Sequence, residues 1–157
     1  MFCCLFMYIP SKITAQTLNL LPDIPEPLTN PHLATAFNGV KTGNTTFTKS
    51  FAESEEVILA TMAYLHPSSP YKDNQAYLDR ALFLLEKVLG GWNNGTMPLN
   101  EMTYGLSAPV SYLMLKQYKP SAITPQQKAS WEAGLRKNID KIIELVKTDT
   151  IKVIFTE

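Results

Sequence analysis

Hydrophobic residues recur with a helical period over most of the chain beyond residue 50. Leu78, Leu82, Leu85 and Leu89 fall at i, i+4, i+7 and i+11, the spacing that places side chains on one face of a helix. Three other segments have comparable stripes, the last running from Trp131 to Val146. The pattern therefore predicts four helices, over residues 50–65, 73–89, 108–118 and 124–147.

Local signals support the starts of these helices. Ser50 with Glu53, and Thr124 with Gln127, have the spacing of a capping box, in which two side chains bond to free backbone N–H groups. Asp73 is a favourable residue at the start of the second predicted helix. All three starts are therefore marked by a polar residue before an apolar stripe.

Proline and glycine predict the helix ends. Pro67 ends the first helix, and Gly90-Gly91 ends the second. The connections within each pair are about five to eight residues long, which favours antiparallel neighbours. The fold class predicted for residues 50–148 is therefore all-α, built from antiparallel helical hairpins. Such hairpins can close as a bundle or form part of a larger ring or solenoid, but no internal repeat indicates a regular array.

The two ends of the chain follow other patterns. Residues 1–15 begin with an apolar run too short to span a bilayer, and small residues follow near Ala15. This is the layout of a secretory signal peptide without its basic start, although a buried terminal helix or strand is the alternative. Residues 16–49 read as a proline-rich extended segment with a possible short helix, and residues 149–157 as an irregular or strand-like tail.

Composition narrows the classes of function. Apolar residues make up 45% and charged residues 18% of the 157 residues, which is typical of a globular domain. The formal net charge is zero, so we expect no nucleic-acid partner and no polybasic membrane patch. Cys3 and Cys4 are the only cysteines, and His32 and His66 the only histidines. We therefore expect no disulfide scaffold, no metal site and no cofactor.

The charged residues of the predicted helices do not form an identifiable catalytic set. His66 lies at a helix end, where a protonated imidazole would complement the helix dipole. Carboxylates on helices usually lie on the solvated face. We interpret the following residues in this way: Glu53, Glu55, Glu56, Asp79, Glu86, Glu132 and Asp140.

The segment Gly91–Thr96 is the feature most similar to a binding site. Trp92 could stack on a sugar face while the amides of Asn93 and Asn94 bond to hydroxyl or carboxylate groups. The alternative is that Trp92 closes one end of the core, a common arrangement for tryptophan, and that Asn94-Gly95 is a turn. Trp92, Asn93 and Asn94 are thus the candidate substrate-binding residues, and no residue receives a catalytic role.

Residues 60–92 (ATMAYLHPSSPYKDNQAYLDRALFLLEKVLGGW) resemble the first hairpin of exported bacterial (α/α)-toroid proteins, the polysaccharide lyases and related carbohydrate-active enzymes. The resemblance extends over residues 50–147. Ile13-Thr14-Ala15-Gln16 also resembles the end of signal peptides in the Bacteroidetes, which often place Gln after the cleaved bond.

The resemblance implies that the chain is the N-terminal portion of a periplasmic or extracellular polysaccharide-degrading protein, with a polysaccharide as its partner. The catalytic residues of that family come from several hairpins around the ring. The resemblance therefore also implies that further C-terminal hairpins of the same fold are missing, and that the chain is inactive alone. The alternative is a non-enzymatic helical module that binds a protein partner or a glycan.

Overall fold

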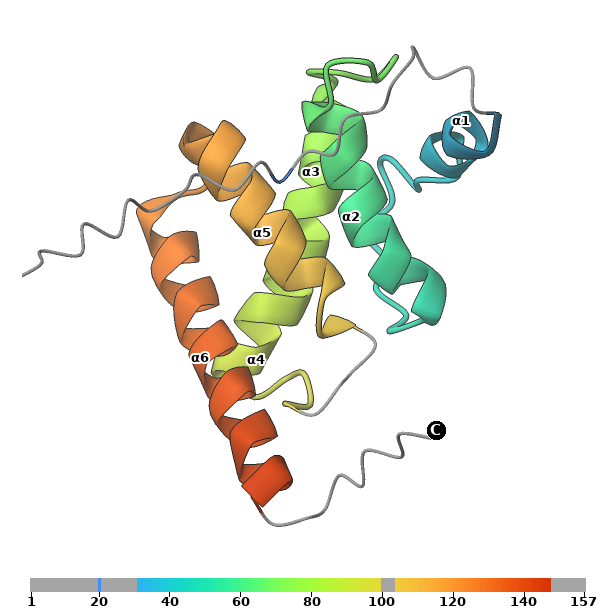
Figure 1. Ribbon diagram of the computed structural model, residues 1–157. Helices are drawn as coiled ribbons and strands as arrows, with labels where there is room; N and C mark the ends of the chain where they lie inside the picture. Colours follow the sequence, from blue (N-terminus) through green and yellow to red (C-terminus); the bar gives the residue numbers. More distant parts are fainter. Residues whose placement is uncertain (1–19, 21–30, 100–103, 148–157) are drawn as a thin grey trace, which may run out of the picture.

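The computed structural model describes residue 20, residues 31–99 and residues 104–147, and within these ranges it contains helices and no strand (Figure 1). The predicted all-α class is confirmed. The predicted leader (1–15) and tail (149–157) lie outside the described residues, as do residues 16–19 and 21–30 of the proline-rich segment. The elements are α1 (Pro31–Asn38), α2 (Phe51–Leu65), α3 (Gln75–Leu85), the π-helical turn η1 (Glu86–Gly90), α4 (Gly91–Asn94), α5 (Ser107–Tyr118), the 3₁₀ turn η3 (Pro120–Ala122) and α6 (Pro125–Lys147).

The predicted caps form at the starts of α2 and α6. The Ser50 hydroxyl accepts the backbone N–H of Glu53 at 3.3 Å. Thr124 and Gln127 bond reciprocally, each side chain accepting the backbone N–H of the other residue. In α2 the box is only half closed, because the Glu53 carboxylate accepts the N–H of Thr48 instead.

The predicted start and end of the second helix are wrong. Asn74, not Asp73, caps α3 by accepting the N–H of Ala76 at 3.1 Å. The helix then continues through Gly90-Gly91 as η1 and α4, because both glycines have right-handed helical backbone angles. It ends at Gly95, whose φ of 80° lies in the left-handed region that favours glycine.

Gly90 allows a polar side chain to fold back over the helix. A Cβ atom at Gly90 would lie 2.6 Å from the Glu86 Oε1 atom. The Glu86 carboxylate occupies that space and accepts the indole N–H of Trp131 at 2.7 Å. The glycine thus serves side-chain packing between η1 and α6, and it does not end the helix.

The helices are arranged in two layers (Figure 1). Helix α2 packs against both α3 and α5, so the first helices of the two hairpins lie side by side. The second helices do the same, since α6 packs against η1 and α4. The core lies between the layers, and its largest fully buried side chains include Trp92, Trp131, Tyr104, Tyr112, Leu84 and Leu85.

Helix α1 is held against this body by Phe37 and Tyr77. The Phe37 ring is buried, and the Tyr77 hydroxyl donates to the Phe37 carbonyl at 3.2 Å. Burial, followed by the effect of the neighbouring Tyr71, raises the pKa of Tyr77 to about 12, so its hydroxyl keeps the proton that it donates.

The apolar stripes that predicted α5 and α6 are buried only in part. Trp131 is fully buried, but four apolar residues after Asn138 on the same helix are exposed. On α5, Met114 is buried, whereas Leu113 and Tyr118 are exposed. The exposed apolar residues of α6 are Ile139, Ile142, Ile143 and Val146.

Among the helices described above, none has the length and apolar character to cross a bilayer.

Candidate functional site

The three predicted site residues lie on α4 and not in a loop, because the helix continues to Asn94. Trp92 is only 1% exposed, and its indole N–H donates to the Pro98 carbonyl at 3.1 Å. The ring therefore closes one end of the core, which is the alternative to sugar stacking that the sequence left open. It has no face open for a sugar.

The two asparagines lie at the surface end of α4. Asn93 donates its amide N–H to the Ser130 hydroxyl at 3.2 Å, and its backbone carbonyl accepts the Lys137 ammonium. Asn94 is exposed, and its Oδ1 atom accepts both the N–H and the hydroxyl of Thr96. These five residues, Asn93, Asn94, Thr96, Ser130 and Lys137, are called the α4 end below.

The α4 end combines amide, hydroxyl and ammonium groups on one surface. Lys49 adds a second cation nearby, donating to the Thr96 carbonyl at 3.5 Å. Amides and hydroxyls pair with sugar hydroxyls, and an ammonium pairs with a carboxylate. These groups can therefore donate hydrogen bonds to a polar ligand and accept hydrogen bonds from it.

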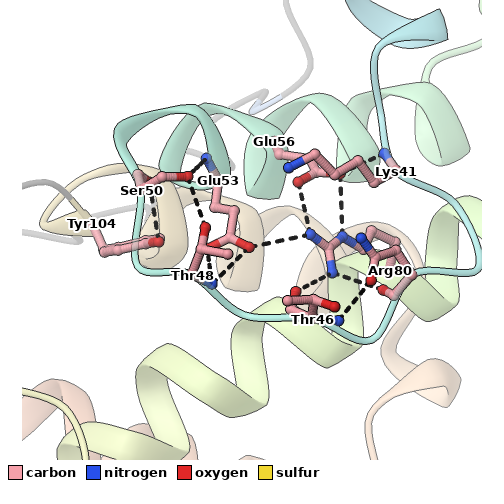
Figure 2. Close-up of polar contacts among 9 residues, drawn as sticks. Lys41, Thr46, Thr48, Ser50, Glu53, Glu56, Arg80 and Tyr104 are labelled. Atoms are coloured by element: carbon pink, nitrogen blue, oxygen red, sulfur yellow. Dashed lines mark hydrogen bonds and ion pairs between the residues drawn. The ribbon is translucent and has the colours of Figure 1, made fainter.

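A buried ionic cluster joins α2 to α3 (Figure 2). The Arg80 guanidinium holds the Glu56 carboxylate in a bidentate pair, with N–O distances of 3.2 and 2.8 Å. Glu53 lies on the same side, 3.6 Å from the Arg80 Nη2 atom. The remaining guanidinium N–H groups donate to the carbonyls of Asn44 and Thr46, at 2.8 and 3.1 Å.

This cluster contradicts the prediction that Glu53 and Glu56 lie on a solvated face. They are 1% and 5% exposed, and Arg80 is 2% exposed. Backbone N–H groups complete the arrangement, from Thr48 to Glu53 and from Lys41 to Glu56. The cluster therefore fastens the strap of residues 41–48 to both helices. A sequence signal existed, since Arg80 falls on the same helical face as the apolar Tyr77 and Leu84.

A half-open pocket with a cavity volume of about 170 Å³ lies beside the cluster. Glu55 is exposed, as predicted, whereas Glu56 is engaged by Arg80. One free carboxylate cannot supply the acid and base that glycoside hydrolysis requires. The lining residues are Ala36, Gly39, Val40, Lys41, Ala52, Glu55, Glu56 and Leu59.

His66 follows α2 as its C-terminal cap residue, so it lies at the helix end as predicted, and it is 4% exposed. Its Nδ1 atom accepts the N–H of Ser68 at 3.1 Å. The ring therefore orders the turn after α2.

Glu132 links α5 and α6 through two partners. It accepts the Lys116 ammonium at 2.8 Å and the Tyr112 hydroxyl at 2.7 Å. These hydrogen bonds, Lys116 first, hold the pKa of Glu132 below its ordinary value, against a smaller effect of burial. Burial, and then the hydrogen bond to Glu132, raises the pKa of Tyr112 above its ordinary value.

Replacing Glu132 with glutamine is expected to cost at most about 1 kcal/mol at neutral pH, because the Lys116 pair is exposed and screened. A lowered folded-state pKa stabilises the fold above the ordinary pKa of glutamate and loses that effect as pH falls through the lowered value. The difference between wild type and Glu132→Gln should therefore shrink as pH falls below the ordinary pKa of glutamate. Urea unfolding over an acidic pH series measures this, and a difference independent of pH would contradict it.

Within the described residues, no group of three or more His, Cys, Asp or Glu side chains could hold a metal ion. Comparison of the chain with protein-family models, curated proteins and solved structures found no match. The candidate site is therefore argued from the α4 end and the ionic cluster. The α4 end has exposed polar groups that a ligand can reach, whereas the charged groups of the ionic cluster are bonded to one another and to the backbone.

Proposed function

We propose that the chain is the N-terminal portion of an exported, polysaccharide-degrading (α/α)-toroid protein, that it contacts glycan through the α4 end, and that it is inactive alone. The observation that supports this most directly is the two-layer arrangement. First helices pack on first helices and second helices on second helices, as successive hairpins do in rings and solenoids of helix pairs.

The polar groups of the chain support contact with glycan more than catalysis. Polysaccharide cleavage needs a positioned acid and base in an open cleft. Two carboxylates that lie together, those of Glu53 and Glu56, are buried and engaged by Arg80. The α4 end, in contrast, exposes Asn94 and Lys137 beside Thr96. We assign it a positioning role toward glycan.

The double variant Asn94→Ala/Lys137→Ala is expected to reduce glycan binding about thirtyfold, since it removes two hydrogen bonds worth about 1 kcal/mol each. Affinity electrophoresis in gels containing uronate-rich or neutral polysaccharides measures the binding. Ultraviolet absorbance of unsaturated uronate products and a reducing-end assay should show no turnover by the wild-type chain.

The matched control is Gln126→Ala/Lys128→Ala, two exposed positions on α6 that are not part of the α4 end. It should bind like wild type. If no polysaccharide retards the wild-type chain, or if the α4-end variant binds as well as the control, the glycan assignment fails. Turnover by the wild-type chain would refute the inactive state.

The second candidate is a non-enzymatic helical module that binds a protein partner or a glycan. The exposed apolar residues of α6 favour a protein partner, because single soluble domains seldom leave such a stripe uncovered.

A further inference from the structure

The exposed apolar surface of the structure is concentrated at one end of the two-layer body. Among the described residues, six of the eight exposed large hydrophobic side chains belong to α5 and α6. The opposite end is covered by α1 and by the strap of residues 41–48, which the Arg80 cluster fastens in place. Stacked helical hairpins need a polar cap at each end, and the described residues form one only at the end that carries α1.

On α6 the change from polar to apolar occurs along a single face. Glu132 and Arg136 precede Ile139 and Ile143 by seven residues, so each pair lies on the same line of the helix. The first half of that line is polar and the second is apolar. A helix face that is exposed to solvent along its whole length is normally polar along its whole length. The apolar second half therefore has the composition of a contact surface.

Ile139, Ile142, Ile143 and Val146, called the α6 stripe, are 54%, 40%, 45% and 55% exposed. Their spacing of i, i+3, i+4 and i+7 is the seam by which two helices pack along their length. Asp140 and Lys147 are exposed and lie two turns apart along one border of the stripe. No ion pair engages either of them within the described part of the chain.

We propose that the α6 stripe binds the α6 stripe of a second copy of this chain, with the two helices antiparallel. A two-fold axis near Ile143 places Ile139 of one copy beside Val146 of the other. It also places Asp140 beside Lys147 of the other copy. In both pairings the two residues are level along the helix axis to within about one residue, or 1.5 Å. The stripe is therefore self-complementary in shape and charge, as a two-fold interface requires.

The small size of the stripe sets the expected strength. Four half-exposed side chains per copy bury much less than the roughly 800 Å² per partner of a standard stable interface. The dimer should therefore be weak and concentration-dependent. This inference does not rest on the glycan assignment, which concerns α4 and its neighbours. It applies to this chain alone, since further hairpins stacked on α5 and α6 would cover the same stripe.

Sedimentation velocity over about a hundredfold range of concentration is expected to show a reversible monomer–dimer equilibrium. Ile143→Lys should abolish it, because the ammonium would be buried at the two-fold axis, whereas Gln126→Lys, on the same helix outside the stripe, should not. Asp140→Lys should weaken the dimer, and Asp140→Lys/Lys147→Asp should restore it. Circular dichroism confirms that each variant keeps its helices.

Orientation is tested by cysteine cross-linking with Cys3 and Cys4 replaced by serine. A short bis-maleimide should join Ile139→Cys to Val146→Cys in a mixture of the two variants, and should join neither variant efficiently to itself. Self-linking of each variant alone would indicate a parallel pair and overturn the proposal. A chain that stays monomeric throughout would overturn it too.

Discussion

Replacing Arg80 with methionine is expected to lower the free energy of unfolding by about 3–5 kcal/mol, a large fraction of the stability of a domain of this size. The substitution keeps the apolar stem and removes the cation that neutralises Glu56 at 2.8 Å and Glu53 at 3.6 Å. Both carboxylates then stay buried without a counter-ion. Urea unfolding followed by circular dichroism measures the loss.

The cost should come from the stranded charges and not from the lost packing of Arg80. Adding Glu53→Gln and Glu56→Gln to the methionine variant should therefore recover a substantial part of the stability, because amide oxygens can still accept the N–H groups of Thr48 and Lys41. Lys116→Met is the control at an exposed ion pair of equal length, 2.8 Å, and should cost at most about 1 kcal/mol. Equal losses in Arg80→Met and Lys116→Met would contradict the argument.

The sequence predicted helices well where the signal was local. The caps at Ser50 and Thr124 need only residues three positions away, and both form. The predicted end at Gly90-Gly91 failed because the reason for these glycines is not local. Gly90 makes room for Glu86, which bonds to Trp131 of a helix that starts some 35 residues later. Glycine as a helix terminator and glycine as a packing site look alike in one sequence.

The candidate site was predictable only in part, for the same reason. Asn93 and Asn94 lie at the surface end of a helix and not in the predicted loop, and Trp92 is buried, with its indole N–H bonded to the Pro98 carbonyl. The carboxylates of Glu53 and Glu56 were misplaced because their partner, Arg80, is on another helix. A charged residue on an otherwise apolar helical face indicates a buried ion pair, whereas a charged residue among other charged residues gives no such indication. The α4 end depends on Lys137, which the fold alone brings there.

The contact between α6 and the π-helical turn depends on Gly134. A Cβ atom at Gly134 would lie 2.0 Å from the Leu89 carbonyl oxygen and 3.1 Å from the Asn93 nitrogen, and both are backbone atoms that cannot rotate away. Gly134 therefore lets α6 approach η1 and α4 with backbone against backbone. Trp131, Gly134 and Asn138 are the buried residues of α6, so this contact holds the helix on the body.

Gly134→Ala is accordingly expected to lower the free energy of unfolding by about 3 kcal/mol, the upper part of the range for overpacking a close contact. The sign is diagnostic, because the same change in an unconstrained helix interior would raise stability by about 1 kcal/mol. Asp140→Ala is the control for introducing alanine at an exposed position of α6. It should stabilise the fold slightly at concentrations where the chain is monomeric. The Trp131 indole resonance should also move in Gly134→Ala, since a displaced α6 loosens its bond to Glu86. Stabilisation by Gly134→Ala with an unmoved Trp131 resonance would contradict this expectation. It would mean that α6 does not contact the π-helical turn through its backbone. The two-layer arrangement would then lack the contact that joins its second helices.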